Sequence, residues 1–237
     1  MVKKKPLSYA PIGIIEGEQG SGKSITGVAR VVDATFENIT EVILPNKEII
    51  KAEPVLPVKP GIAKLYFPNK EPIIGKLPAG SVAIAEDVRI YANFHLYGIR
   101  AMYLPIKLLL EFLNTGLITD GYILIDEGYI ATNAREGMTA LVRLVMKLTN
   151  QVRKRHLHLY LLTPHSRQID WQIRWAKTEH IQCSYDEITA EVSLIINRKG
   201  EKPINITFGT KQYRPYYDTD EQFEIPEGEI LKALAKL

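Results

Sequence analysis

One stretch near the start of the chain decides its fold, and it reads Ile12-Gly13-Ile14-Ile15-Glu16-Gly17-Glu18-Gln19-Gly20-Ser21-Gly22-Lys23-Ser24. The first part is a short apolar run of the kind that forms a buried strand. The second part has the spacing G-x-x-x-x-G-K-S, and residues 23–34 then carry apolar side chains at helical spacing. A strand, a glycine-rich loop and a helix in this order make up a P-loop. The stretch therefore predicts a site for the phosphates of a nucleoside triphosphate.

Each residue type in this loop has a chemical role. Glycines let the backbone approach phosphate oxygens closely, because a Cβ atom would intrude there. The backbone N–H groups form an anion nest at the positive end of the following helix. We expect Lys23 to reach the β- and γ-phosphates of the nucleoside triphosphate and Ser24 to bind Mg²⁺ through its hydroxyl. The predicted nucleotide-binding residues are Gly17, Glu18, Gln19, Gly20, Ser21, Gly22, Lys23, Ser24 and Ile25.

A second motif ends a later apolar run, residues 121–125, with two carboxylates, Asp126 and Glu127. The run predicts a buried parallel strand. We expect Asp126 to hold Mg²⁺ and Glu127 to polarise the attacking water, which favours a hydrolase over a small-molecule kinase. An earlier pair, Glu86-Asp87, also follows an apolar run, but that run is shorter and weaker.

The chain of 237 residues suits one large α/β domain, and we assign all of 1–237 to a single P-loop ATPase domain. Within it we predict a basic leader at 1–11, a Pro-rich insertion at 45–80, and a C-terminal hairpin with a short helix at 190–237. No run of about 18 apolar residues occurs, so we expect no membrane span. The single Cys183 fits a reducing compartment, and we predict a cytoplasmic location.

Alternating strands and helices predict an α/β fold with a mostly parallel central sheet, helices on both faces and an antiparallel C-terminal hairpin. We expect further strands at 41–44, 81–85, 99–104 and 157–163, and a strand beginning near 181. The hairpin strands are expected at 192–197 and 204–208. Further helices are expected at 106–114, 138–152, 169–175 and 227–237.

Positive charge is concentrated in one segment. Residues 135–180 hold nine Lys/Arg against three Asp/Glu, a balance of +6 in a chain whose total is +3. This segment favours a polyanion partner or a basic surface between subunits, with a solvated helix face as the alternative. Hydrolysis also needs positive charge at the γ-phosphate, often an arginine from a neighbouring subunit. The first candidates for this arginine are Arg153 and Arg155, and further ones are Arg135, Arg143 and Arg174.

These motifs resemble those of the P-loop ATPases of the FtsK–HerA superfamily. Within it they look most like the compact viral genome-packaging ATPases and the Zot-like phage assembly ATPases. The matching stretches are residues 17–24, 93–96, 123–127, 153–156 and 169–174. The later stretches discriminate more than the P-loop does, since very many families share a P-loop.

The resemblance implies a RecA-like core, a homo-oligomeric ring (a pentamer or hexamer) around double-stranded DNA, and translocation driven by ATP with Mg²⁺. It places Lys23 and Ser24 at the phosphates and Mg²⁺. It places Asp126 on Mg²⁺, Glu127 at the attacking water, and Arg155 or Arg153 near a neighbour's nucleotide. It also implies a capsid or portal protein as partner, and a location in the host cytoplasm or at the capsid vertex.

The sequence differs from the superfamily pattern at the end of the strand expected at 157–163. There the superfamily usually has Thr-Gln, and the Gln senses the γ-phosphate. In this chain Pro164 follows Thr163. We therefore name Thr163, His165 and Gln168 as candidate sensor residues.

The expected function is ATP-driven translocation of double-stranded DNA, most specifically viral genome packaging. A Zot-like ATPase that moves coat protein or extrudes a virion is the first alternative. A nucleotide-binding structural or switch protein is the second. DNA-stimulated ATP turnover would separate the translocase from both.

Overall fold

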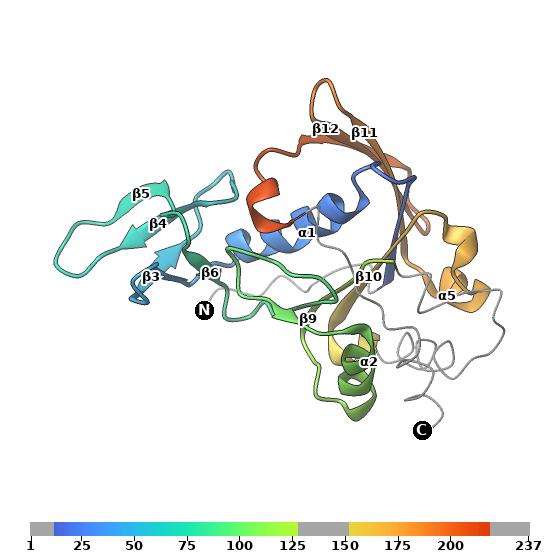
Figure 1. Ribbon diagram of the computed structural model, residues 1–237, viewed down its shortest axis with the longest axis horizontal. Helices are drawn as coiled ribbons and strands as arrows, with labels where there is room; N and C mark the ends of the chain where they lie inside the picture. The colour runs from blue at the N-terminus through green and yellow to red at the C-terminus, as the bar shows by residue number, and fades with distance from the viewer. Residues whose placement is uncertain (1–11, 128–151, 219–237) are drawn as a thin grey trace.

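The computed structural model describes residues 12–127 and 152–218, which form an eight-stranded sheet and a five-stranded sheet (Figure 1). The predicted leader at 1–11, nearly all of the helix at 138–152, and the helix at 227–237 lie outside these residues. No helix in the described part of the chain has both the length and the apolar character that a membrane span requires.

The eight-stranded sheet is built around the strand that leads into the glycine loop. Its order is β13-β12-β11-β1-β10-β9-β7-β8, with β11 to β8 parallel and β12 and β13 antiparallel. The bounds are β1 Ile12–Glu16, β7 Ile90–Ala92, β8 Met102–Tyr103, β9 Gly121–Ile125, β10 Leu157–Thr163, β11 Glu179–Asp186, β12 Glu191–Arg198 and β13 Ile204–Gly209. The predicted α/β fold class, with a mostly parallel sheet and an antiparallel hairpin, is confirmed.

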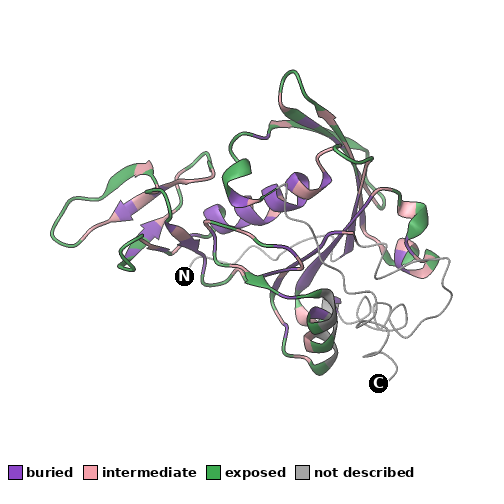
Figure 2. Ribbon diagram, viewed as in Figure 1, coloured by how far each residue is buried: buried purple, intermediate pink, exposed green. Residues whose placement is uncertain are grey.

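Helices cover both faces of this sheet, because apolar side chains of the central strands alternate between two cores. Ile15 packs in the core that holds α1 (Lys23–Glu37). Ile12 and Ile14 pack in the opposite core, with α2 (Ile106–Thr115) and α5 (Trp171–Ala176). All of β10 is buried, since it lies between the two cores (Figure 2).

The strand order determines where a site can form. β10 lies between β1 and β9, and Glu16 is paired in register with Thr163. Because β1, β10 and β9 are parallel, their carboxyl ends lie at one edge of the sheet. Ligands of open α/β sheets bind at this edge. The glycine loop after β1 and the two carboxylates after β9 therefore meet there.

The insertion at 45–80 is more regular than expected. We predicted loops and short edge strands, because prolines interrupt the apolar runs. The structure instead forms a second, antiparallel sheet in the order β5-β4-β3-β2-β6, which projects to the left in Figure 1. Its strands are β2 Glu41–Ile43, β3 Ile49–Glu53, β4 Ile62–Tyr66, β5 Ile73–Lys76 and β6 Val82–Ile84. The prolines lie between the strands, and the inner residues Val42, Ala52 and Leu65 join the core under α1.

At the far edge of the central sheet one expected strand was wrong, and one strand was not predicted. The strand expected at 99–104 is reduced to β8, because Ile99 makes only an isolated bridge with Ala83 and Pro105 precedes α2. β9 pairs with β10 on one side and with β7 on the other, and β7 was not predicted from the sequence. Three residues are too few to show a period of two.

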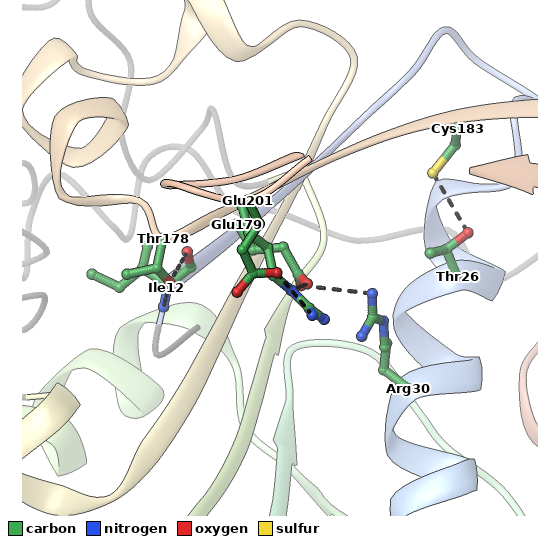
Figure 3. Close-up of polar contacts among 8 residues, drawn as sticks. Ile12, Thr26, Arg30, Thr178, Glu179, Cys183 and Glu201 are labelled. Atoms are coloured by element: carbon green, nitrogen blue, oxygen red, sulfur yellow. Dashed lines mark hydrogen bonds and ion pairs between the residues drawn. The ribbon is translucent and has the colours of Figure 1, made fainter. Parts of the chain in front are cut away.

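A buried ion cluster fixes α1 against the antiparallel strands. The side chain of Glu179, at the start of β11, is only 1% exposed. Its carboxylate lies 2.9 Å from Arg198 Nε and 3.6 Å from Arg30 Nη2 of α1 (Figure 3). A buried carboxylate is tolerated only when it is paired, so the cluster holds β11, β12 and α1 in one arrangement.

Candidate active site

Gly22 makes the turn from the glycine loop into α1. Its φ is 87°, in the left-handed region that disfavours side chains. A Cβ atom there would also lie 2.5 Å from Val192 Cγ2 of β12. Gly17 is equally confined, since a Cβ atom would lie 2.9 Å from the carbonyl oxygen of Cys183. The loop can therefore pack against β11 and β12 only with glycine at these two positions.

Lys23 and Ser24 begin α1 and reach in two directions. Lys23 is buried, and its Nζ donates a hydrogen bond to the carbonyl oxygen of Glu18 at 2.8 Å. Ser24 Oγ donates to Asp126 Oδ2, after β9, at 2.6 Å. The hydroxyl and the carboxylate are hard oxygen donors of the kind that Mg²⁺ prefers. The two predicted metal ligands are thus adjacent, and the donor set fits Mg²⁺.

The backbone of Asp126 is held by Asn93, which directly follows β7. Asn93 Oδ1 accepts from Asp126 N at 2.8 Å, and Asn93 Nδ2 donates to Asp126 O at 3.0 Å. Burial raises the pKa of Asp126, while hydrogen bonds from Ser24 and from the Glu127 N–H and the Lys23 charge oppose that rise. A bound cation would stabilise the ionised form of this buried carboxylate.

Glu127 has a left-handed backbone conformation, with a φ of 53°. This conformation is uncommon for a residue other than glycine, and such residues cluster at active sites. Its N–H donates to Asp126 Oδ1 at 2.8 Å, which helps to hold the turn. The carboxylate of Asp126 thus contacts Ser24, and Glu127 is a second acidic residue of the same cavity lining.

A cavity of about 630 Å³ lies over the glycine loop. This volume is within the range of small-molecule sites. It is lined by Gln19, Gly20, Gly22, Lys23, Ser24 and Ile25, by Asp126 and Glu127, and by Tyr185, Thr210, Arg214, Tyr217 and Asp218. Of the predicted nucleotide-binding residues, Gly17, Glu18 and Ser21 do not line it. The earlier carboxylate pair, Glu86-Asp87, follows β6 of the second sheet and does not line it either.

The candidate sensor residues lie at the carboxyl end of β10, outside the cavity lining. Thr163 is buried, and its Oγ1 donates to the carbonyl oxygen of His165 at 3.1 Å. His165 Nδ1 lies 3.3 Å from Glu16 Oε1, and Gln168 is exposed in the short helix η2 (Ser166–Gln168). A sensing role for these residues stays a prediction.

Glu16 is the last residue of β1, and its side chain links β1 to both neighbouring strands. Its Oε1 accepts from Ser166 N at 2.9 Å after β10, and its Oε2 lies 2.6 Å from His180 Nε2 of β11. Burial on its own would raise the pKa of Glu16. The hydrogen bonds from Ser166 and the two histidines outweigh burial, and this pKa is lowered. Glu16 therefore acts as an ionised link between three strands, immediately before the glycine loop.

The first two candidate finger arginines lie at the opposite end of the sheet. Arg153 and Arg155 form the short helix η1 (Arg153–Arg155), immediately before β10. The seven residues of β10 span about 20 Å from its amino end to its carboxyl end. Both arginines are thus far from the cavity of their own chain, and a role at a neighbour's nucleotide stays a prediction. Arg174 lies on α5, and Arg135 and Arg143 are outside the described residues.

Neither a family model nor a curated protein sequence matches the chain. Among solved structures, the N-terminal domain of zonular occludens toxin from Neisseria meningitidis matches with a TM-score of 0.55 at 13% identity. The match covers 89% of this chain and 100% of that domain. This chain has a P-loop NTPase fold. The predicted resemblance to Zot-like proteins is therefore confirmed at the level of the fold.

Two further matches have TM-scores below 0.5. One is the genome packaging NTPase B204 from Sulfolobus turreted icosahedral virus 2 in complex with ATP-gammaS, with a TM-score of 0.45 at 10% identity, over 82% of this chain and 95% of that chain. The other is a KaiC-like protein from the hyperthermophilic archaeon Pyrococcus horikoshii, with a TM-score of 0.46 at 9% identity, over 85% of this chain and 87% of that chain.

Two parts of this candidate site were not predicted from the sequence. Asn93 was noticed within a matching stretch but given no role, and the only local signal is a polar residue after a three-residue apolar run. The side of the cavity that is formed by Tyr185 and residues 210–218 was not predicted at all. Its signal is the stretch Tyr213-Arg214-Pro215-Tyr216-Tyr217, which is unusually aromatic for a segment after a hairpin.

Proposed function

We propose that this chain hydrolyses ATP with Mg²⁺. The observation that carries the proposal is the 2.6 Å hydrogen bond between Ser24 Oγ and Asp126 Oδ2, in a cavity that Lys23 and Glu127 also line. It brings together a phosphate-binding lysine, a pair of metal ligands and a second carboxylate. Phosphoryl transfer to water requires these three parts.

Each residue has a defined task in this proposal. Ser24 and Asp126 would hold Mg²⁺, which would neutralise charge that develops on the phosphate oxygens. Lys23 moves from the carbonyl oxygen of Glu18 to the phosphates. Glu127 accepts a hydrogen bond from the attacking water and takes its proton. Asn93 keeps the turn that separates the two carboxylates.

We further propose that hydrolysis drives a ring-shaped motor on double-stranded DNA, such as a viral genome-packaging motor at a capsid vertex. The basic segment supports this, since a motor contacts the phosphate backbone without reading sequence. In the described part of the chain, the positive charges of the basic segment lie in two places. One is η1, at the amino end of β10, and the other is the region of η2 and α5. A subunit that contributes Arg153 or Arg155 to the next subunit's cavity needs a head-to-tail interface, and such an interface forms a ring when its rotation closes.

A second candidate is a Zot-like assembly ATPase that acts on protein. The fold likeness to the zonular occludens toxin domain, which is matched over its whole length, supports this candidate. Both candidates share the hydrolysis site, so they differ only in the polymer that stimulates it.

The test is ATP turnover by the full chain with and without linear double-stranded DNA, at low and moderate salt. A motor that grips the phosphate backbone predicts strong stimulation that fades as salt rises, because counterion release weakens at high salt. Turnover that is indifferent to DNA would contradict the DNA motor and favour the assembly ATPase. Absence of any turnover would contradict the proposed hydrolysis.

A further inference from the structure

The cavity has a second wall that the P-loop does not supply. Phosphates bind to the amides and the lysine of the glycine loop. A nucleoside triphosphate also has a base and a ribose, which must occupy the rest of the cavity. That remaining surface comes from Tyr185 of β11 and from residues 210–218, which follow β13.

The segment at 210–218 is fixed against the helix that begins at the P-loop. Tyr213 is buried, and its hydroxyl donates to both carboxylate oxygens of Asp33 on α1, at 2.9 and 3.0 Å. Thr210 Oγ1 donates to the carbonyl oxygen of Ala190 at 3.0 Å. The carbonyl oxygen of Tyr216 accepts from Tyr97 N at 3.0 Å. The wall is therefore held at three points before any ligand binds.

Arg214 lies between these anchors, in the short helix η3 (Arg214–Tyr216), and its side chain is exposed. Its Nη2 donates to the hydroxyl of Tyr185 at 3.0 Å. The ring of Tyr185 is half-buried against the core under α1, so its position is fixed by packing. The cavity wall thus carries a guanidinium and a phenol ring, two flat groups that are joined by a hydrogen bond.

We propose that Tyr185 and Arg214 form a stacking wall for the base of a purine nucleoside triphosphate. Aromatic rings and guanidinium planes both stack on bases, and a purine offers the larger face. This inference rests on the proposed function, since it assumes that the triphosphate occupies the glycine loop. Ile25, at the start of α1, supplies an apolar side chain to the same cavity.

The wall is also joined to the carboxylate side of the site. The ring of Tyr217 makes an edge contact with Phe94, with ring centroids 5.4 Å apart. Phe94 directly follows Asn93, which holds the backbone of Asp126. One short loop after β7 therefore contacts both the base wall and the backbone of Asp126.

The test measures binding of two probes to the full chain by titration calorimetry. One probe is ATP-γ-S with Mg²⁺, and the other is inorganic tripolyphosphate, which has no base. The variants are Tyr185→Ala, Tyr185→Phe, Arg214→Ala and Arg214→Lys. The matched control is Lys211→Ala, an exposed cation of the same segment that does not line the cavity.

We expect Tyr185→Ala and Arg214→Ala to weaken ATP-γ-S binding about ten-fold each and to leave tripolyphosphate binding unchanged. Tyr185→Phe keeps the ring and should stay close to the wild type, whereas Arg214→Lys keeps the charge but should behave like the alanine variant. Wild-type binding of CTP should be weaker than that of ATP, because the pyrimidine face is smaller.

Other results would overturn the inference. If Arg214→Ala weakened both probes equally, Arg214 would act on phosphates and the stacking wall would be wrong. If the alanine variants bound both probes like Lys211→Ala, the base would lie elsewhere while the proposed function survived. If the wild type bound neither probe, the proposed function itself would fail.

Discussion

The two walls of the cavity are built in opposite ways. The phosphate wall is one continuous stretch, from the end of β1 to the start of α1, and packing against β11 and β12 requires glycine at Gly17 and Gly22. The base wall is assembled from β11 and from the segment after β13. The difference shows that phosphate chemistry demands particular residues at particular spacing, whereas a base can stack on any flat group that the fold delivers.

Among the substitutions that compare the two walls, Lys23→Ala in the phosphate wall should have the largest effect. Removing this buried ammonium should lower turnover about 100-fold or more, because it takes away charge aimed at the transferring phosphate. Phosphate release at saturating ATP measures this. The matched control is Lys76→Ala, an exposed lysine of β5 in the second sheet, which should turn over ATP like the wild type. Equal activity of the two variants would remove Lys23 from the mechanism.

The next effect is expected behind the phosphate wall, from Asn93→Ala. Two hydrogen bonds to the backbone of Asp126 are lost, so the carboxylate is less well positioned for Mg²⁺. Turnover should fall about 10-fold or more, and the Mg²⁺ concentration for half-maximal turnover should rise. Tripolyphosphate binding without Mg²⁺ should not change. A fall in turnover with an unchanged Mg²⁺ requirement would show that Asn93 acts only through general stability.

A third prediction concerns the crosslink below both walls, Glu16. The Glu16→Gln variant should have a free energy of unfolding about 1–3 kcal/mol lower at pH 7, since charge-assisted hydrogen bonds are lost. Thermal unfolding across pH measures this.

The sign of the pH dependence follows from the two pKa shifts. The pKa of Glu16 is lowered from 4.5, so its stabilisation is present above pH 4.5 and is lost as the pH falls through the folded-state pKa. Burial and the nearby Lys177 lower the pKa of His180 from 6.5, although its bond to Glu16 opposes this shift. The folded state therefore also loses stability as the pH falls below 6.5, because protonation of His180 costs more in the folded than in the unfolded chain. Wild-type stability should therefore fall as the pH drops below 6.5, where His180 gains a proton, and fall again below pH 4.5, where Glu16 gains one. Glu16→Gln should lack the second of these losses, below pH 4.5. A stability that rises with acid would contradict this account of the crosslink.

The smallest effect is expected at the anchor of the base wall, from Tyr213→Phe. The variant loses the hydroxyl that binds the Asp33 carboxylate on α1, and the free energy of unfolding should fall by about 1 kcal/mol. ATP-γ-S binding should weaken slightly while tripolyphosphate binding is retained. A loss of tripolyphosphate binding would mean that the two walls are not separable.

Most of the central sheet could be predicted from the sequence because its strands are buried on both faces. The apolar runs that became β1, β9 and β10 are long enough to be recognised, and the carboxylates after β9 follow from the run itself. The hairpin of β12 and β13 was also expected, since its strands alternate around a polar turn.

The remaining features depend on contacts between distant residues. β7 has three residues and owes its place to pairing with β9, and Asn93 matters only because that pairing brings it to Asp126. The second sheet has alternating burial in β3 and β4, but the prolines between its strands hid this pattern. The base wall requires Tyr185 and Arg214 to meet across a hairpin, and no local spacing encodes that contact.

The central claim is that the two carboxylates after β9 divide the work, with Asp126 at the metal and Glu127 at the water. The most direct test compares the wild type with Glu127→Gln, measuring ATP binding and phosphate release on the same samples. Loss of a general base should lower turnover about 10²- to 10⁴-fold while ATP binding stays as in the wild type. Unchanged turnover in Glu127→Gln would contradict the assignment, and the hydrolytic mechanism would have to be built on another residue.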